Sequence, residues 1–292
     1  MRPILFGRIH CLCCGYWRTS YHNFDVRPLF CPYSATTELK ENTQMSITVY
    51  DNDLNPIIEK ASNEELQFLV DVLTKTMTNG LNSTEEYKQF SPDHRKYANL
   101  IAKEIREFGG NSFVNVWRKE GPAYKEIVCD VAKALKAPFN KESSIERIES
   151  SILETILSKA LADMSDEEKT TILKEFEKEN KFEWKNLTGP SLTTAILGLF
   201  NAGGFASYQL AVMITKAIAT SIFHTTLPFV AYTTLTKSLS IVFGPIGWII
   251  TGAWAAVDIA GPAKRITIPC VIYIAMLRKR AEQKLLGCAD PE

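Results

Sequence analysis

The sequence predicts an all-α fold, a multi-helix bundle with a Gly/Ala-rich hydrophobic C-terminal helical part. Apolar residues recur three and four positions apart over most of the chain from Met45 onward, whereas the alternation typical of strands is almost absent. Hydrophobic residues make up 46% of the 292 residues and charged residues 23%, so a sizeable core is available. We expect two helical parts, an acidic domain over residues 50–185 and a hydrophobic domain over residues 190–286.

Residues 1–44 are predicted to be a disordered leader or a start-site artefact, with Met45 as the natural beginning. They show no sustained helical or strand period. Four of the seven cysteines lie there, but HCLCCGYW followed by Cys31 lacks the paired spacing of zinc ligands, and no clean apolar run with a cleavage site marks a signal peptide. The other three cysteines are scattered, which indicates thiols in a reducing compartment.

Removing residues 1–44 is therefore expected to leave folding intact. Thermal melts of the full and shortened chains should nearly coincide, because a leader without a buried face contributes no packing. A large loss of stability in the shortened chain would contradict this prediction.

The elements of the acidic domain follow from helix start and stop signals. A serine followed three residues later by a glutamate forms a capping box at Ser62 and again at Ser165, and Pro or Gly residues open and end other helices. The helices expected in chain order are a short one bearing Leu54, Ile57 and Ile58, one after Ser62, one from Ser91-Pro92 to Gly109-Gly110, a short one capped by Asn111 or Ser112, one from Gly121-Pro122 to Leu135, and two over about residues 144–162 and 165–180. The first two form a short N-terminal helical module over residues 50–76.

The hydrophobic domain holds only three charged residues between Gly189 and Pro262. Residues 239–257 are uncharged and about long enough to cross a bilayer. We expect residues 240–269 to form a hairpin or two short helices packed on their neighbours, broken near Gly261-Pro262, with a last helix from about Thr267; membrane insertion is the alternative. Small residues recur at helix-packing intervals at Gly198, Ala202 and Ala206.

The charge balance differs between the two domains although the whole chain is neutral. Residues 45–190 carry a net charge of −6, which argues against nucleic-acid binding, whereas residues 191–292 carry +4. Basic residues on or near the last helix would attract anionic lipid head groups, and a solvated helix face would look the same. These candidate lipid-facing residues, named here the basic cluster, are Lys264, Arg265, Arg278, Lys279, Arg280 and Lys284.

Three stretches of the sequence carry a resemblance to a known family. They are DNDLNPIIEKASNEELQFLVDVLTK (51–75), HRKYANLIAKEIREFGGNSFVNVWRKEGPAYKEIVCDVAKALK (94–136, within a central block over residues 91–137) and RITIPCVIYIAMLRK (265–279), which follows Gly244, Pro245 and Gly247. The chain resembles the YaaW-like family, uncharacterised bacterial proteins grouped with the ubiquinol-cytochrome c chaperone family. The resemblance implies a chaperone-like role linked to respiratory-complex assembly, without a defined site.

Four residues of the central block, named here the polar set, could serve general acid-base catalysis if they converged: His94, Arg118, Tyr124 and Asp130. The alternative is structural, with His94 solvated in a first helical turn, Arg118 paired with an acidic neighbour, and the Tyr124 hydroxyl at a surface rim. We favour this alternative, so His94→Ala is expected to leave folding and partner capture unchanged. Metal-ligand spacings, a phosphate loop and a nucleophile elbow are absent from the sequence after Met45, so no metal, cofactor or catalytic residue is expected.

The sequence thus predicts a non-enzymatic interaction or assembly protein of a bacterial cell, chaperone-like by resemblance. We expect it in the cytoplasm, peripheral to or inserted at the inner membrane. The expected partners are a protein and an anionic membrane surface, with no nucleic acid. Two alternatives stay open: a membrane-inserting or pore-forming helical protein, and a hydrolase using the His94 region.

Overall fold

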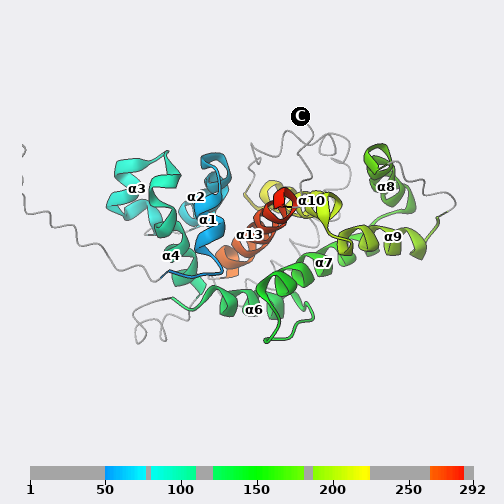
Figure 1. Ribbon diagram of the computed structural model, residues 1–292, viewed down its shortest axis with the longest axis horizontal. Coiled ribbons are helices and arrows are strands. Elements are labelled where there is room, and N and C mark those ends of the chain that lie inside the picture. Colours follow the sequence, from blue (N-terminus) through cyan, green and yellow to red (C-terminus); the bar gives the residue numbers. More distant parts are fainter. Residues whose placement is uncertain (1–49, 77–79, 110–120, 181–186, 224–263, 286–292) are drawn as a thin grey trace, which may run out of the picture. The chain divides into compact units, whose positions relative to one another are not determined.

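The computed structural model describes residues 50–76, 80–109, 121–180, 187–223 and 264–285, and every element in these ranges is helical (Figure 1). The predicted all-α fold is confirmed. The α-helices are α1 (Asn55–Lys60), α2 (Asn63–Thr76), α3 (Glu85–Phe90), α4 (Ala98–Gly109), α6 (Tyr124–Leu135), α7 (Ile145–Asp163), α8 (Asp166–Asn180), α9 (Pro190–Asn201), α10 (Gly204–Phe223) and α13 (Lys264–Leu285), with 3₁₀ helices η1 (Leu81–Ser83) and η2 (His94–Tyr97).

Both predicted capping boxes form. The Ser62 N–H donates to Glu65 Oε2 at 2.7 Å and the Glu65 N–H donates to Ser62 Oγ at 3.3 Å, which satisfies two free donors at the start of α2. The second box repeats this geometry at α8, where the Ser165 N–H donates to Glu168 Oε2 at 2.8 Å and the Glu168 N–H donates to Ser165 Oγ at 3.2 Å. Local sequence signals therefore determine where these two helices begin.

Other boundaries of the acidic domain agree in part with prediction. Helix α6 runs to Leu135 as expected, and it stops at Lys136, whose φ of 58° takes the chain out of the helix. The helix expected from Ser91-Pro92 is α4, but it begins only at Ala98, because the chain first passes through η2. The short helix predicted after residue 111 lies outside the described residues.

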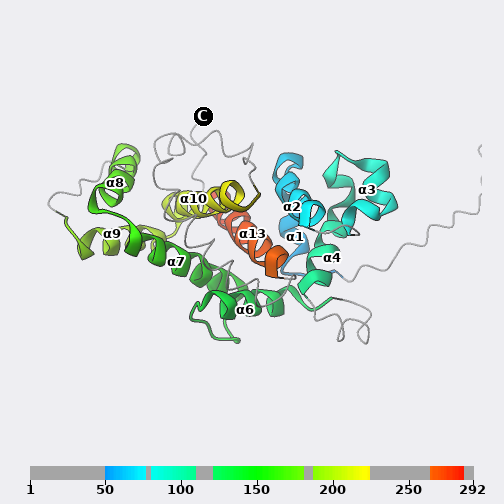
Figure 2. The ribbon, with the colours of Figure 1, turned by 180° about the vertical axis from the view of Figure 1, so that it is seen from behind.

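Helix α13 lies at the centre of the described core. It packs against α1, α2, α4, α6, α7 and α10 (Figure 2). Ile268, Val271, Ile272 and Ala275 are buried as predicted. Tyr273 is fully buried, and its hydroxyl donates to the Glu65 carbonyl at 2.6 Å. Each large apolar side chain buried here contributes about 1.5–3 kcal/mol to folding.

The predicted start of this last helix is wrong. Helix α13 begins at Lys264 rather than near Thr267, and it continues through Pro269. The proline has no N–H to donate to the carbonyl of Arg265, four residues earlier, so one hydrogen bond of the first turn is missing. The remainder of the predicted hairpin, residues 240–263, lies outside the described residues.

The apolar helices α9 and α10 meet at a sharp bend of 109°. Gly203 and Gly204 have φ values of +78° and +63°, which favour glycine. The bend separates Gly198 on α9 from Ala206 on α10, so the predicted row of small residues is not one helix face. No single helix among the described residues is long and apolar enough to cross a membrane, whereas the α9–α10 pair reaches that length and composition together.

All of the described residues belong to one compact unit. Within it, α13 from the predicted hydrophobic domain packs against five helices from the predicted acidic domain. The division near residues 186–189 stays a prediction drawn from composition and charge.

Candidate functional site

A buried ion pair joins α7 to α13. Glu149 is 2% exposed, and its Oε2 accepts from Arg278 Nε at 2.7 Å. Tyr124, fully buried at the start of α6, donates its hydroxyl to Glu149 Oε1 at 2.8 Å. Arg278 Nη2 also donates to the Asp53 carbonyl at 2.7 Å. We name Glu149, Tyr124 and Arg278 the buried network.

The protonation states of the buried network follow from its surroundings. Burial raises the pKa of Glu149, and Arg278 and the Tyr124 hydroxyl oppose this rise because they stabilise the charged carboxylate. Burial, followed by the nearby Glu149 charge, raises the pKa of Tyr124. The hydroxyl therefore stays protonated and donates a hydrogen bond to Glu149. The predicted position of the Tyr124 hydroxyl at a surface rim is therefore wrong.

Asp51 caps α6 although it lies 73 residues earlier in the sequence. Its Oδ2 accepts from the Tyr124 N–H at 2.8 Å and lies 3.7 Å from Arg106 Nε. Arg106 in turn donates from Nε to the Pro122 carbonyl at 2.9 Å and from Nη2 to the Gly121 carbonyl at 3.0 Å. A carboxylate at a helix N-terminus satisfies a free donor and favours the helix dipole. These contacts join the segment before α1, helix α4 and the start of α6.

His94 is buried in η2 at 2% exposure, so its predicted solvated position is wrong. The Gln67 amide nitrogen donates to Asp71 Oδ1, so the amide oxygen, Oε1, is on the side that faces His94. This oxygen accepts from His94 Nε2 at 2.8 Å. His94 Nδ1 then accepts from the Tyr97 hydroxyl. Burial lowers the pKa of His94 and raises that of Tyr97 to about 12, so both side chains are neutral at neutral pH.

Replacing His94 with alanine is now expected to destabilise the protein by about 2 kcal/mol, because the Tyr97 hydroxyl loses its acceptor and a cavity opens. Arg95→Ala, at the exposed neighbouring position, serves as the control and should change stability by less than about 0.5 kcal/mol. Urea unfolding at pH 7.5 measures both variants. Equal midpoints would contradict the structural role of His94.

The other members of the polar set lie elsewhere. Asp130 is exposed on α6 and pairs with Lys133 at 2.8 Å, and Arg118 lies outside the described residues. Among the contacts of the described residues, His94 and Tyr124 share no hydrogen-bond partner. Within the same ranges no three His, Cys, Asp or Glu side chains are grouped so that they could hold a metal ion. The structure therefore brings no two described members of the set together.

Three consecutive cations of the basic cluster contact three different helices. Arg278 belongs to the buried network with α7, Arg280 pairs with Glu65 of α2, and Lys279 Nζ lies 4.8 Å from the ring centre of Phe200 on α9. Successive residues of a helix point about 100° apart, so three neighbours in sequence can reach three neighbouring helices. These three side chains are therefore partly buried against neighbouring helices, whereas the sequence predicted a solvated or lipid-facing surface.

The basic cluster is also divided along the helix. Lys264 is half-buried and Arg265 is exposed at the start of α13, about 20 Å along the helix axis from Arg278. The side chain of Lys284 lies outside the described part of the chain. The described cations therefore occupy two ends of α13 and form no single patch.

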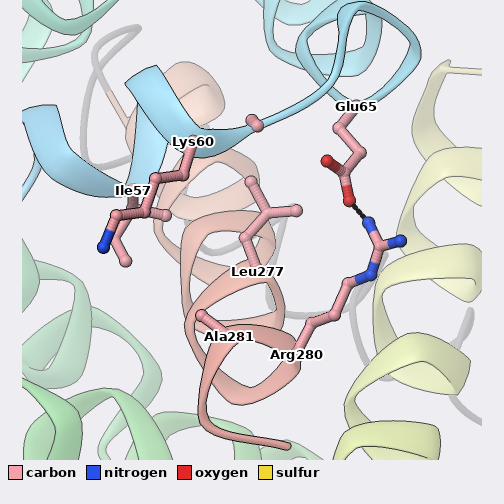
Figure 3. Close-up of a pocket in the computed structure, with 7 residues that line it drawn as sticks. Ile57, Lys60, Glu65, Leu277, Arg280 and Ala281 are labelled. Carbon is pink, nitrogen blue, oxygen red and sulfur yellow. Dashed lines mark ion pairs between the residues drawn. The ribbon is translucent and has the colours of Figure 1, made fainter. Parts of the chain in front are cut away.

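A pocket of about 280 Å³ lies where α1 and the start of α2 face α13 (Figure 3). Its lining residues are Ile57, Lys60, Ala61, Glu65, Leu277, Arg280 and Ala281. Figure 3 shows the Glu65–Arg280 ion pair on one side of Leu277 and the Lys60 ammonium on the other. The pocket thus combines an apolar wall with charged groups at two edges.

Glu104 on α4 is a buried acid outside the buried network, with 8% of the residue exposed. Burial raises the pKa of Glu104 to about 7; Glu107 adds to the rise and Lys103 opposes it. Because the unfolded-state pKa is near the ordinary value of about 4.5, the folded protein binds the extra proton between about pH 4.5 and 7. The contribution of Glu104 to the free energy of unfolding is therefore highest at low pH, and it falls as the pH rises from about 4.5 to 7.

Glu104→Gln is expected to raise the free energy of unfolding by about 2 kcal/mol at pH 8 and to leave it nearly unchanged at pH 4.5, since glutamine carries no charge at either pH. Glu86→Gln on the exposed face of α3 is the matched control and should show no such difference. Denaturant unfolding across pH 4.5–8 measures both. A constant difference between wild type and Glu104→Gln over this range would contradict the prediction.

Sequence reasoning missed Glu149 and Asp51. For Glu149 a signal exists, because buried Ile145, Ile152 and Leu153 lie three and four residues away on the same face of α7. An acid within an apolar helix face indicates a buried partner. Asp51 offers no such signal, since its partner at the start of α6 is distant in sequence.

The protein is all-helical, and the described members of the polar set make their contacts in separate places. The chain belongs to the UPF0174 family. It is 41% identical over 240 residues to a UPF0174 protein of Helicobacter pylori strain J99, covering 80% of this chain and 93% of that protein. It is 30% identical over 238 residues to the UPF0174 protein YaaW of Escherichia coli strain K12, covering 78% and 94%. The predicted resemblance to YaaW is confirmed.

A second H. pylori relative, from strain 26695, is 38% identical over 209 residues and is covered along its whole length. No protein-family model matches the chain. No solved structure matches it either.

Proposed function

We propose that the protein is a non-enzymatic interaction protein of a bacterial cell. The separation of the polar set carries this proposal. His94 is enclosed between Gln67 and Tyr97, and the Tyr124 hydroxyl is bonded to Glu149. A catalytic acid or base has to reach a substrate together with its partners. Because His94 and Tyr124 already make hydrogen bonds in separate places in the fold, their positions support binding by the folded surface rather than acid-base chemistry.

The finer form of the proposal is a chaperone-like role in assembling membrane-bound complexes at the inner membrane. The resemblance to proteins grouped with the ubiquinol-cytochrome c chaperone family supports it. Lys264 and Arg265 at the start of α13 support contact with anionic head groups, because each basic residue near such a surface contributes about 1 kcal/mol. Arg278, Lys279 and Arg280 are used within the fold.

Affinity capture from bacterial membranes solubilised in mild detergent tests the interaction role. The full chain is expected to retain a stoichiometric protein partner, and a folded His94→Gln variant should retain the same partner equally. Absence of a stoichiometric partner in both membrane and soluble fractions would contradict the proposal. An activity of the purified chain that the folded His94→Gln variant lacks would favour the hydrolase alternative instead.

One observation favours membrane insertion as a second candidate function. The bent α9–α10 pair has the combined length and composition of a span. Sedimentation of the protein with anionic vesicles, followed by a high-salt wash, distinguishes the two membrane roles. Release by salt indicates peripheral binding through cations. Retention until detergent is added indicates insertion of apolar helices.

A further inference from the structure

We propose that the pocket between α1, α2 and α13 binds a small amphipathic monocarboxylate, an acid with a short aliphatic chain. This site is independent of the interaction role proposed above. Its volume of about 280 Å³ lies just below the range of about 300–1,000 Å³ for sites that bind drug-sized ligands. The ligand is therefore of fragment size, with about ten non-hydrogen atoms and an affinity on the order of 1 mM.

The wall of the pocket determines the apolar part of the ligand. Ile57 and Leu277 supply branched aliphatic surface, and Ala61 and Ala281 keep the space open because their side chains are short. Figure 3 shows Leu277 between the charged residues, directed toward α1. Each methylene buried against such a wall raises affinity roughly fourfold. An aliphatic chain fits this surface without leaving polar atoms unpaired.

The charges at the edges determine the polar part of the ligand. Lys60 and Arg280 are positive and Glu65 is negative, so the pocket has one net positive charge. Arg280 lines the pocket and uses Nη1 for Glu65. A guanidinium has five N–H donors, and its positive charge favours a nearby carboxylate. The exposed Lys60 ammonium offers a second positive group on the opposite edge.

The same charges favour a monoanion over a dianion. One carboxylate balances the single net positive charge of the pocket. A phosphate monoester would place close to two negative charges near Glu65, where like charges repel. The Glu65 carboxylate is held in place by the Ser62 N–H and Arg280, so it stays at the edge of the pocket.

Ligand-observed NMR and calorimetry on the full chain at pH 7.5 test this assignment with four probes. Octanoate carries both parts of the ligand, octanol has the chain with a neutral head, acetate has the head with almost no chain, and octyl phosphate has a dianionic head. Octanoate is expected to bind at least tenfold more tightly than each of the other three. Equal or tighter binding of octanol or octyl phosphate would overturn the assignment of a monocarboxylate.

Two variants locate the binding at this pocket. Lys60→Met keeps the length of the side chain and removes its charge, so octanoate binding should weaken about tenfold. Ala281→Leu fills the pocket with a good helix former, so binding should disappear while the thermal melt stays close to that of wild type. Lys88→Met on the exposed face of α3 is the control and should bind octanoate as wild type does.

Either of two results would overturn the proposal. The first is no detectable octanoate binding to wild type at several millimolar. The second is unchanged octanoate binding by both Lys60→Met and Ala281→Leu when both melt as wild type does. If Ala281→Leu does not fold, the octanoate binding of Lys60→Met alone tests the proposal. An exposed lysine can be replaced without loss of core packing, so this variant should fold.

Discussion

Arg278→Met is expected to lower the free energy of unfolding by about 3–5 kcal/mol. The substitution removes the cation from the buried network and leaves the Glu149 carboxylate, 2% exposed, with only the Tyr124 hydroxyl as a donor. A buried charge without a partner is among the most costly defects in a protein core. Because a typical domain is stable by only about 5–15 kcal/mol, thermal and urea unfolding at pH 7.5 should show a large shift.

The double variant Glu149→Gln/Arg278→Met separates the loss of charge balance from the loss of packing. Glutamine carries no charge and still accepts from Tyr124, so the double variant should recover most of the lost stability. Lys133→Met removes the cation of an exposed pair with Asp130 and should cost less than about 0.5 kcal/mol. If Arg278→Met costs as little as Lys133→Met, the buried network does not stabilise the fold.

Gly121→Ala is expected to destabilise the protein by about 3 kcal/mol. A Cβ atom at this position would lie 2.4 Å from the carbonyl carbon of Arg106 and 2.7 Å from the backbone nitrogen of Glu107. Backbone atoms cannot rotate away, so α4 and the start of α6 would have to separate. The hydrogen bond from Arg106 Nη2 to the Gly121 carbonyl, 3.0 Å long, would be disturbed as well.

Gly198→Ala is the matched control for this prediction. A Cβ at position 198 meets no atom within 4 Å, and the residue lies inside α9. Alanine is a better helix former than glycine, so this variant should gain up to about 1 kcal/mol. In urea unfolding, the free energy of unfolding should fall for Gly121→Ala and rise for Gly198→Ala. A similar loss in both variants would contradict the close approach at Gly121.

Much of the fold could be predicted from the sequence because its signals are local. Ser62 and Glu65 lie three residues apart, so their capping box can be recognised without knowledge of the tertiary structure. The apolar period of α13 likewise identified its buried face. The start of α13 was predicted wrongly, because a proline usually ends a helix, whereas in the folded chain the helix continues through Pro269.

The candidate site could be predicted less well because its contacts are distant in sequence. Arg278 and Glu149 are 129 residues apart, and nothing in either segment specifies the other. A run of basic residues looks like a solvated surface when only its composition is considered. In the folded chain the rotation of the helix directs Arg278, Lys279 and Arg280 to three different neighbours.

The separation between Glu149 and Arg278 has a consequence for folding during synthesis. A ribosome that adds about 5–20 residues per second needs about 6–26 seconds to extend the chain from one residue to the other. During that interval Glu149 lies on the apolar face of α7 and its partner Arg278 has not yet been synthesised. The described helices from α1 up to and including α7 can form early, but their final packing waits until α13 has been translated.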